Sequence, residues 1–554
     1  MPIIKHMPGN CTPYVVKAMN ELKLCEESTL VFEKNIYWFG KEGTLERRCN
    51  VSNNAHGIKN IIFIFEDLNK ITIDGQGATF IFEAGTFPFV GNRAKNVTLK
   101  NFNIAYVRPF HTEGTVVMVN KENHWFDLLI DREKYPFRIE KGNFIAVCGN
   151  YECTADVDFL ITEYDPETKA MAFGQSPYVL HSGKPVDGKE CIWAEELDNG
   201  NVRFFTNTNL NPIPGNVLTF QNEGRKNCGI FFNRSENIRL ENINIFECAG
   251  MGVVMQRTKN ILLKNVAIRL REEIEEGYDP KRCVSITADA THFVNCMGTL
   301  ELRDCRMMNM LDDATNIHGV YTLIKERISN DAVYVEYPHG NIQAYNSNES
   351  VYLVCRNNMK RKYDAKIKSV EYVNERCDII TFDRELPEEI VDGFAVENVT
   401  AMPERVHISG CYTGHNRPRG FLITTCGKVL VENNKFCNPH CGIEMAADAN
   451  FWFESGPVED VEIRNNTFLS CGTVFHCDAI TIVPSVPEGE EKFHGKISIH
   501  DNEFITAHGG LLTANRVNLL DFYNNIVKLE TEEVVLDRRL PVTLNNCGVG
   551  KLSV

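Results

Sequence analysis

Short runs of alternating hydrophobic and polar residues recur along the chain, and most end in a polar pair containing asparagine or aspartate. Three clear copies, NVTLKNFNI, NIRLENINI and NILLKNVAI, start at Asn96, Asn237 and Asn260. Equivalent positions are 23 residues apart from Asn242 to Asn265 (265 − 242). This period, with short strands and asparagine at the bends, is typical of a β-solenoid, whereas a leucine-rich repeat needs a helix in every repeat. We therefore predict an all-β fold, a right-handed parallel β-helix.

Two stretches interrupt this rhythm with longer strands and tight turns. Residues 116–218 and 320–402 have the pattern of antiparallel hairpins, and we predict that each forms a β-barrel-like domain inserted into the solenoid. Hydrophobic residues at helical spacing in 13–24 predict a short helix that caps the open end. The predicted order is a cap with the first turns, inserted domain 1, central turns, inserted domain 2 and final turns, at 1–115, 116–218, 219–319, 320–402 and 403–554.

Three aspartates stand in two related phrases one period apart. ADATH contains Asp289, and DDATN contains Asp312 and Asp313. Residues one turn apart in a parallel β-helix stack at about 4.8 Å. Asp289 is therefore expected over Asp312 (312 − 289 = 23) or over Asp313 (313 − 289 = 24), and the sequence leaves both registers open.

Carboxylates packed in this way repel one another, so at least one is expected to hold a proton near neutral pH. A protonated acid beside ionised bases is suited to cleaving a glycosidic bond. Two other interpretations stay open. A ladder of aspartates can simply cap bends, and clustered carboxylates also suit calcium.

A second polar cluster follows in NRPRGFLITT and CGIEMAADANFWFESG. An exposed tryptophan can lie against the apolar face of a sugar ring, and arginine and glutamate can bind its hydroxyl groups. A core tryptophan and solvated arginines are the plainer interpretation. Together with the polar residues beside the aspartates, the candidate substrate-binding residues are His292, Asn316, His318, Arg417, Arg419, Glu444, Asp448, Trp452 and Glu454.

Composition narrows the choice of partners. The 554-residue chain has a formal net charge of −16, which argues against nucleic acid and acidic polysaccharides as partners. The chain contains no apolar stretch long enough to span a membrane, so we predict no membrane segment.

The 20 cysteines include no CxxC pair, so we predict free thiols and no metal site. The first residues show no secretory signal, which predicts a cytoplasmic protein, and intact native disulfides in non-reducing mass spectrometry would contradict this.

The phrases ADATHFVNC and LDDATNIHG, with NRPRGFLITT and FWFESG after them, resemble glycoside hydrolase family 110, and the resemblance covers nearly the whole chain. Members of this family are bacterial α-1,3-galactosidases that release terminal galactose from blood-group-B-type glycans. The resemblance therefore implies an exo-acting hydrolase that inverts the anomeric configuration without a cofactor or a metal. It further implies that Asp312 is the general acid, while Asp289 and Asp313 hold and deprotonate the attacking water.

The expected partner is thus an oligosaccharide with a terminal α-galactose. A calcium-dependent polysaccharide lyase and a non-catalytic carbohydrate-binding β-helix are the alternative functions. We also predict a homodimer, because the inserted domains add surface that can pair symmetrically. Light scattering at the mass of a single chain would contradict it.

Overall fold

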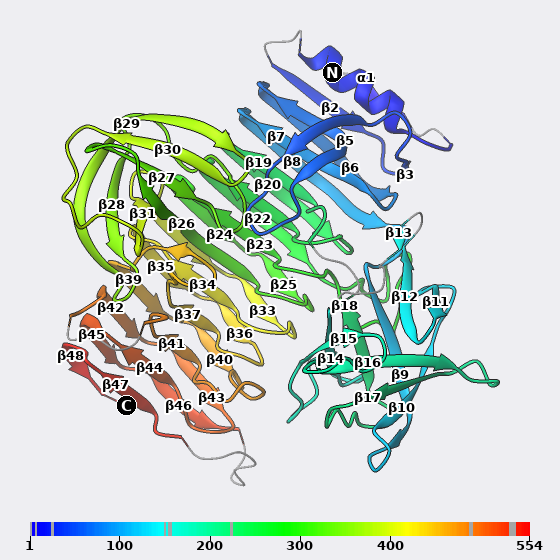
Figure 1. The fold of residues 1–554 in the computed structure, drawn as a ribbon. Helices are drawn as coiled ribbons and strands as arrows, with labels where there is room; N and C mark the ends of the chain where they lie inside the picture. Colours follow the sequence, from blue (N-terminus) through cyan, green and yellow to red (C-terminus); the bar gives the residue numbers. More distant parts are fainter. Residues whose placement is uncertain are drawn as a thin grey trace.

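The computed structural model shows a long solenoid of stacked parallel strands with a barrel on either side (Figure 1). The N-terminus lies at one end of the stack and the C-terminus at the other. The structure describes residues 3–5, 8–23, 27–148, 151–152, 158–221, 225–486, 491–530 and 539–553.

One wall of the solenoid is built from strands that pair in parallel from turn to turn. In order along the stack they are β6 (Asn69–Phe82), β8 (Lys95–Tyr106), β20 (Glu236–Ile245), β22 (Lys259–Ile268), β24 (Met297–Arg303), β32 (Pro403–Ser409), β35 (Lys428–Glu432), β39 (Asp460–Arg464), β42 (His494–His500) and β45 (Val517–Tyr523). Alternate residues along these strands point into the solenoid, and they form one continuous hydrophobic core.

The second wall is also parallel and it positions the acidic residues. Its strands are β5 (Gly57–Glu66), β7 (Thr86–Asn92), β19 (Ile230–Asn233), β21 (Val253–Gln256), β23 (Thr291–Val294), β26 (Thr315–Arg327), β34 (Phe421–Thr424), β37 (Ile443–Met445), β41 (Ile480–Ile482), β44 (Leu512–Asn515) and β47 (Val542–Asn545). Asp289 lies just before β23, while Asp312 and Asp313 lie just before β26.

Asparagine marks the bends, as the repeat predicts. Asn101, Asn242 and Asn265 all have left-handed backbone angles, with φ of 60°, 55° and 52°. The Asn265 amide donates to Asn242 Oδ1 at 2.9 Å, and the Asn242 amide donates to Asn101 Oδ1 at the same distance. The repeated asparagine therefore both makes the bend and ties each turn to the previous one.

The helix α1 (Thr12–Leu22) lies where the sequence predicts a helix and packs on the first turns. Its buried face includes Val15, Met19 and Leu22, which join the solenoid core. Residue 24, the last of the predicted helix, lies outside the described residues. In the described part of the chain no helix is both long enough and apolar enough to cross a membrane.

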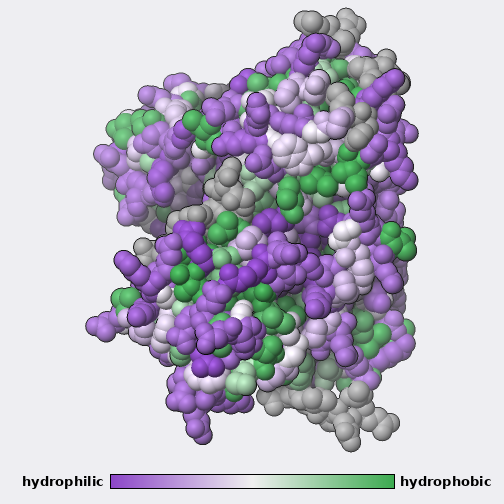
Figure 2. Space-filling view, turned by 90° about the vertical axis from the view of Figure 1, so that its right-hand side faces the viewer, coloured by the Kyte–Doolittle hydropathy of each residue, from purple (hydrophilic) through white to green (hydrophobic). Residues whose placement is uncertain are grey.

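The first inserted domain is a closed barrel with its own phenylalanine-rich core. Its strands are β9 (His111–Asn120), β10 (Trp125–Ile130), β14 (Asp158–Tyr164), β15 (Tyr178–Ser182), β16 (Cys191–Glu196), β17 (Val202–Thr206) and β18 (Val217–Gln221). All neighbours pair antiparallel except β15 and β16. Figure 2 looks onto this side of the molecule, where hydrophilic residues predominate and hydrophobic ones gather in small patches.

The second inserted domain is an antiparallel barrel that grows out of β26, whose first residues belong to the solenoid. It is completed by β27 (Ala332–Glu336), β28 (Ser350–Cys355), β29 (Lys360–Asn374), β30 (Cys377–Phe382) and β31 (Phe394–Asn398). Arg257, between β21 and β22, bonds to Glu349 and to the Ala344 carbonyl and so ties this barrel to the solenoid. The fold is thus the predicted parallel β-helix with two inserted barrels.

Candidate active site

The three aspartates lie together at the base of a cleft of about 290 Å³. Each carboxylate has one oxygen atom near the other two carboxylates, and these three oxygen atoms lie within 4.8 Å of one another. Thr291 pairs with Thr315, and the Ala290 N–H donates to the Asp313 carbonyl at 2.9 Å. Asp289 therefore stacks on Asp313, which settles the register that the sequence left open.

Two arginines hold Asp312. Arg225 Nη2 donates to Asp312 Oδ2, and Arg417 Nη2 lies 3.3 Å from Asp312 Oδ1. Arg417 is itself fixed by a 2.7 Å hydrogen bond from Nε to the Leu311 carbonyl. Arg225 also lies 3.9 Å from Asp289 Oδ1, so its charge acts on both turns.

A third arginine grips Asp313 with two parallel hydrogen bonds. Arg419 donates from Nε to Oδ1 at 2.9 Å and from Nη2 to Oδ2 at 2.8 Å. Its remaining Nη1 donates to Glu444 Oε1 at 3.3 Å. A bidentate pair of this kind fixes direction as well as charge, so Glu444 and Asp313 together hold the guanidinium plane beside the cleft.

The three carboxylates differ in pKa because their surroundings differ. Burial, reinforced by the charge of Asp312, raises the pKa of Asp289 to about 7. Burial also raises the pKa of Asp313 to about 6, although Arg419 opposes the shift. For Asp312 the charges of Arg225, Arg417 and Arg419 outweigh burial and lower the pKa.

The family resemblance implies that Asp312 is the general acid, but in the free protein the three arginine charges favour its ionised form. The sequence shows the repelling carboxylates, but the guanidinium groups that offset the repulsion come from distant segments. Asp312 is ionised at neutral pH, and the proton belongs to one of the other two carboxylates.

Two buried histidines continue inward from Asp289. His292 Nδ1 lies 2.8 Å from Asp289 Oδ2, and His292 Nε2 lies 3.0 Å from His318 Nε2. His318 Nδ1 lies 2.7 Å from the carbonyl oxygen of Gly319. Burial lowers the pKa of His292 to about 3 and the pKa of His318 to about 4, so both rings are neutral at pH 7.

The Gly319 carbonyl determines which nitrogen atom of each histidine ring carries a proton. A carbonyl oxygen only accepts, so His318 Nδ1 carries the hydrogen and His318 Nε2 accepts from His292 Nε2. The Nδ1 atom of His292 then has no proton, and Asp289 Oδ2 has to donate to it. The hydrogen-bond directions thus favour a proton on Asp289, and burial raises its pKa to about 7, so the protonated form is well populated near neutral pH. Glu454 also faces His318 Nε2, at 3.8 Å, but its Oε1 already accepts from the Asn316 amide at 3.0 Å.

The cleft brings together most of the other predicted residues. Arg417, Arg419, Asn316, Trp452 and Glu454 line it with the aspartates. Trp452 is 46% exposed and packs edge-on against Phe451. An exposed indole at the rim of a polar cleft suits the apolar face of a sugar ring.

Four predicted substrate-binding residues do not line the cleft. His292 and His318 are buried behind Asp289, which places them in a supporting position. Glu444 lies behind Arg419. Asp448 accepts from the backbone N–H groups of three following residues, Trp452 among them, and so shapes the loop that carries the tryptophan.

Sequence reasoning missed Arg225, Asn53, His440 and Phe475, which also line the cleft. Arg225 follows directly on the first inserted domain, where the chain returns to the solenoid. The position of Arg225 at the end of the inserted domain is the feature of the sequence that could have indicated it. A segment that rejoins the solenoid near the turns with the aspartates can place a side chain beside them.

Three carboxylates at this spacing also suggest a calcium site, and the neighbouring residues show whether calcium would fit. Calcium takes six to eight oxygen ligands. Here the guanidinium groups of Arg225, Arg417 and Arg419 already occupy oxygens of Asp312 and Asp313. A dication beside three fixed cations is unfavourable, so the arrangement does not fit calcium.

Comparisons with known proteins identify the family of the chain. Residues 112–218 match the model of the family described as GLAA-B beta-barrel domain I. The chain is 32% identical to alpha-1,3-galactosidase A of Shewanella woodyi, over 93% of this chain and 83% of the relative, and 31% identical to alpha-1,3-galactosidase B of Bacteroides thetaiotaomicron, over 97% and 87%. Among solved structures, the tailspike protein of bacteriophage HK620 aligns with a TM-score of 0.44 at 9% identity, over 99% of this chain and 64% of that one. The full-length relationship at 32% identity shows that the chain belongs to the α-1,3-galactosidase family of glycoside hydrolases.

Proposed function

We propose that the protein is an exo-acting, inverting α-1,3-galactosidase that removes terminal α-1,3-linked galactose from B-antigen-type or linear Galα1-3Gal glycans. The observation that carries the proposal is a carboxyl group hydrogen-bonded to a buried histidine beside two arginine-bound carboxylates in a single cleft. The relatives over nearly the full chain, which are named alpha-1,3-galactosidases, support the linkage. A cleft of about 290 Å³ is at the small end of ligand pockets, which favours a single terminal sugar.

In this proposal Asp289 protonates the glycosidic oxygen, and the adjacent pair orients and deprotonates water. Asp289 carries the proton in the free protein because His292 accepts it in a hydrogen bond. Asp312 is ionised and Arg419 fixes the direction of Asp313, so both can act as acceptors for a water molecule. These assignments exchange the roles that the family resemblance implies for Asp289 and Asp312.

Inversion is supported by the number of carboxylates. The closest oxygens, within 4.8 Å, do not by themselves leave the wide gap of most inverting pairs. However, two ionised carboxylates beside one acid can hold a water between them, whereas a retaining enzyme needs one nucleophile only. The third carboxylate is therefore best explained as a second acceptor for the attacking water.

Proton NMR during hydrolysis of Galα1-3Gal, with EDTA present, tests function and stereochemistry together. We expect β-galactose to appear first, because single displacement inverts an α-linkage, and we expect full activity under chelation. α-Galactose as the first product would exclude inversion. No turnover of the disaccharide or of the B trisaccharide would contradict the proposed substrate. Cleavage of an acidic polysaccharide that needs added calcium and leaves an unsaturated product would favour the lyase.

The pKa values predict a narrow, bell-shaped pH dependence of kcat/KM. The acid form of Asp289 is lost as the pH rises through about 7, which gives the alkaline limb. Asp313 is ionised only above about pH 6, which gives the acid limb. With an activated aryl galactoside, whose leaving group needs no proton, the alkaline limb should flatten while the acid limb stays. An alkaline limb of equal steepness for both substrates would contradict the assignment of Asp289.

A further inference from the structure

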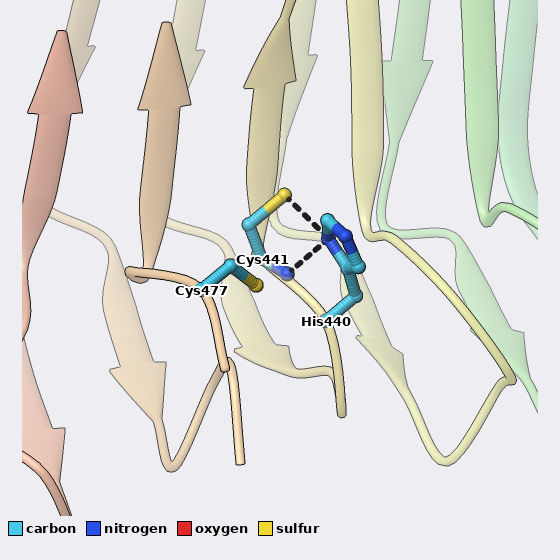
Figure 3. Close-up of side chains that lie close together, drawn as sticks. All are labelled: His440, Cys441 and Cys477. Carbon is cyan, nitrogen blue, oxygen red and sulfur yellow. Dashed lines mark hydrogen bonds between the residues drawn. The ribbon is translucent and has the colours of Figure 1, made fainter. Parts of the chain in front are cut away.

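A second cluster of reactive side chains lies next to the cleft. His440, Cys441 and Cys477 each offer one donor atom, and these atoms lie within 4.8 Å of one another. Figure 3 shows the two cysteine side chains and the imidazole turned toward a common point. His440 and Cys441 precede β37, and Cys477 precedes β41 on the next turn, so the stacking of the solenoid brings them together.

A carboxylate lies beside two of these donors. Glu444 Oε2 lies 3.6 Å from Cys441 Sγ and 3.9 Å from His440 Nδ1, which is itself 3.1 Å from Cys441 Sγ. Donor atoms bound tetrahedrally to zinc lie about 3.3 to 3.8 Å apart, given bond lengths of about 2.0 to 2.3 Å. The separations of 3.1, 3.6 and 3.9 Å among these three donor atoms are close to this range before any ion is bound.

We propose that His440, Cys441, Cys477 and Glu444 form a site for a thiophilic divalent cation, with zinc as the best match. Two sulfur donors with one imidazole favour zinc over calcium or magnesium, which prefer oxygen. This proposal departs from the prediction of no metal site, which relied on the absence of CxxC pairs, because the two cysteines are 36 residues apart in the sequence (477 − 441).

The imidazole is available as a ligand. His440 Nδ1 accepts the Cys441 backbone N–H at 2.8 Å, so this nitrogen carries no proton. Binding of a divalent cation forms two metal–sulfur bonds and releases the protons of the bound thiols to solvent, with no change of oxidation state.

Occupation of the site would reach the catalytic residues through Glu444. Its other oxygen, Oε1, accepts from Arg419, which in turn fixes Asp313. A cation that draws the Glu444 carboxylate toward the sulfurs weakens its hold on Arg419. We therefore expect the ion to inhibit hydrolysis, and this consequence rests on the proposed function.

Cobalt(II) titration of the reduced full-length protein tests the site without any assay of activity. We expect one equivalent to produce the thiolate-to-cobalt charge-transfer band and the visible bands of a tetrahedral site, and zinc to displace it. Cys477→Ser and Cys441→Ser should each abolish the charge-transfer band. Cys355→Ser, in the second barrel and similarly half-buried, should leave it unchanged. No stoichiometric binding, or a band that survives Cys477→Ser, would overturn the site.

An activity assay then tests the inhibitory consequence. Cys477→Ser should hydrolyse α-galactoside at the normal rate and lose inhibition by zinc at concentrations that inhibit the unchanged protein. Equal inhibition of both would overturn the link through Glu444. Absence of hydrolysis without metal would count against the proposed function, while the cobalt spectra would still decide the metal site.

Discussion

Replacement of Asp289 by asparagine is expected to lower kcat/KM on Galα1-3Gal by about 10²- to 10⁴-fold, and far less on p-nitrophenyl α-galactoside. A sugar leaving group needs a proton in the transition state, whereas nitrophenolate leaves without one. Asparagine keeps the size of the side chain but cannot protonate the glycosidic oxygen. The difference between the two substrates, measured by initial rates, is therefore the signature of a lost acid.

The neighbouring aspartates supply the comparison. Asp312→Asn and Asp313→Asn should harm both substrates alike, because attack by water is lost in each case. Asp304→Asn is a matched control at an exposed bend of the same region, where a left-handed φ of 55° suits asparagine equally well, and it should keep normal rates. If Asp312→Asn alone shows the leaving-group difference, the roles implied by the family resemblance hold and our assignment of Asp289 fails.

Replacement of Arg257 by methionine is expected to cost about 3 to 5 kcal/mol of stability. Arg257 is 2% exposed, and its guanidinium bonds to Glu349 and to the Ala344 carbonyl across the junction between solenoid and second barrel. Removing it leaves a buried carboxylate without its cation. Chemical denaturation followed by circular dichroism should show a lower midpoint.

An exposed ion pair on the same solenoid gives the control. Arg239 contacts Glu241 while 53% of its side chain is exposed, and an exposed pair contributes about 0 to 1 kcal/mol. Arg239→Met should therefore barely move the midpoint. If Arg257→Met is equally mild, the junction does not depend on this pair, and the barrel is held by its apolar contacts.

Features that depend on local spacing could be predicted from the sequence. The 23-residue step and the bend asparagines gave the solenoid, because a bend needs a residue that tolerates positive φ. The interruption of that step located the two barrels. The repeat of the Asp-Ala-Thr phrase brought Asp289, Asp312 and Asp313 together, because stacked turns place equivalent residues side by side.

Features that depend on contacts between distant segments could not be predicted from the sequence. The step is 23 residues between Asn242 and Asn265, but 24 between the paired Thr291 and Thr315, so spacing alone left the register open. The ionised state of Asp312 depends on Arg225, which arrives from the end of the first barrel. His292 was grouped with the substrate-binding residues because the sequence does not show which way a side chain next to Asp289 points.

The stacked strands beneath the cleft also limit how its specificity can change. Asp289, Asp313 and Arg419 come from three successive turns whose backbones are joined by ladder hydrogen bonds, such as Ala290 N–H to the Asp313 carbonyl and Ala314 N–H to the Arg419 carbonyl. The backbone positions that carry these side chains are therefore separated by the strand spacing, about 4.8 Å for each turn. A change of specificity is therefore expected in loops such as the one carrying Trp452, where insertions leave the ladder intact.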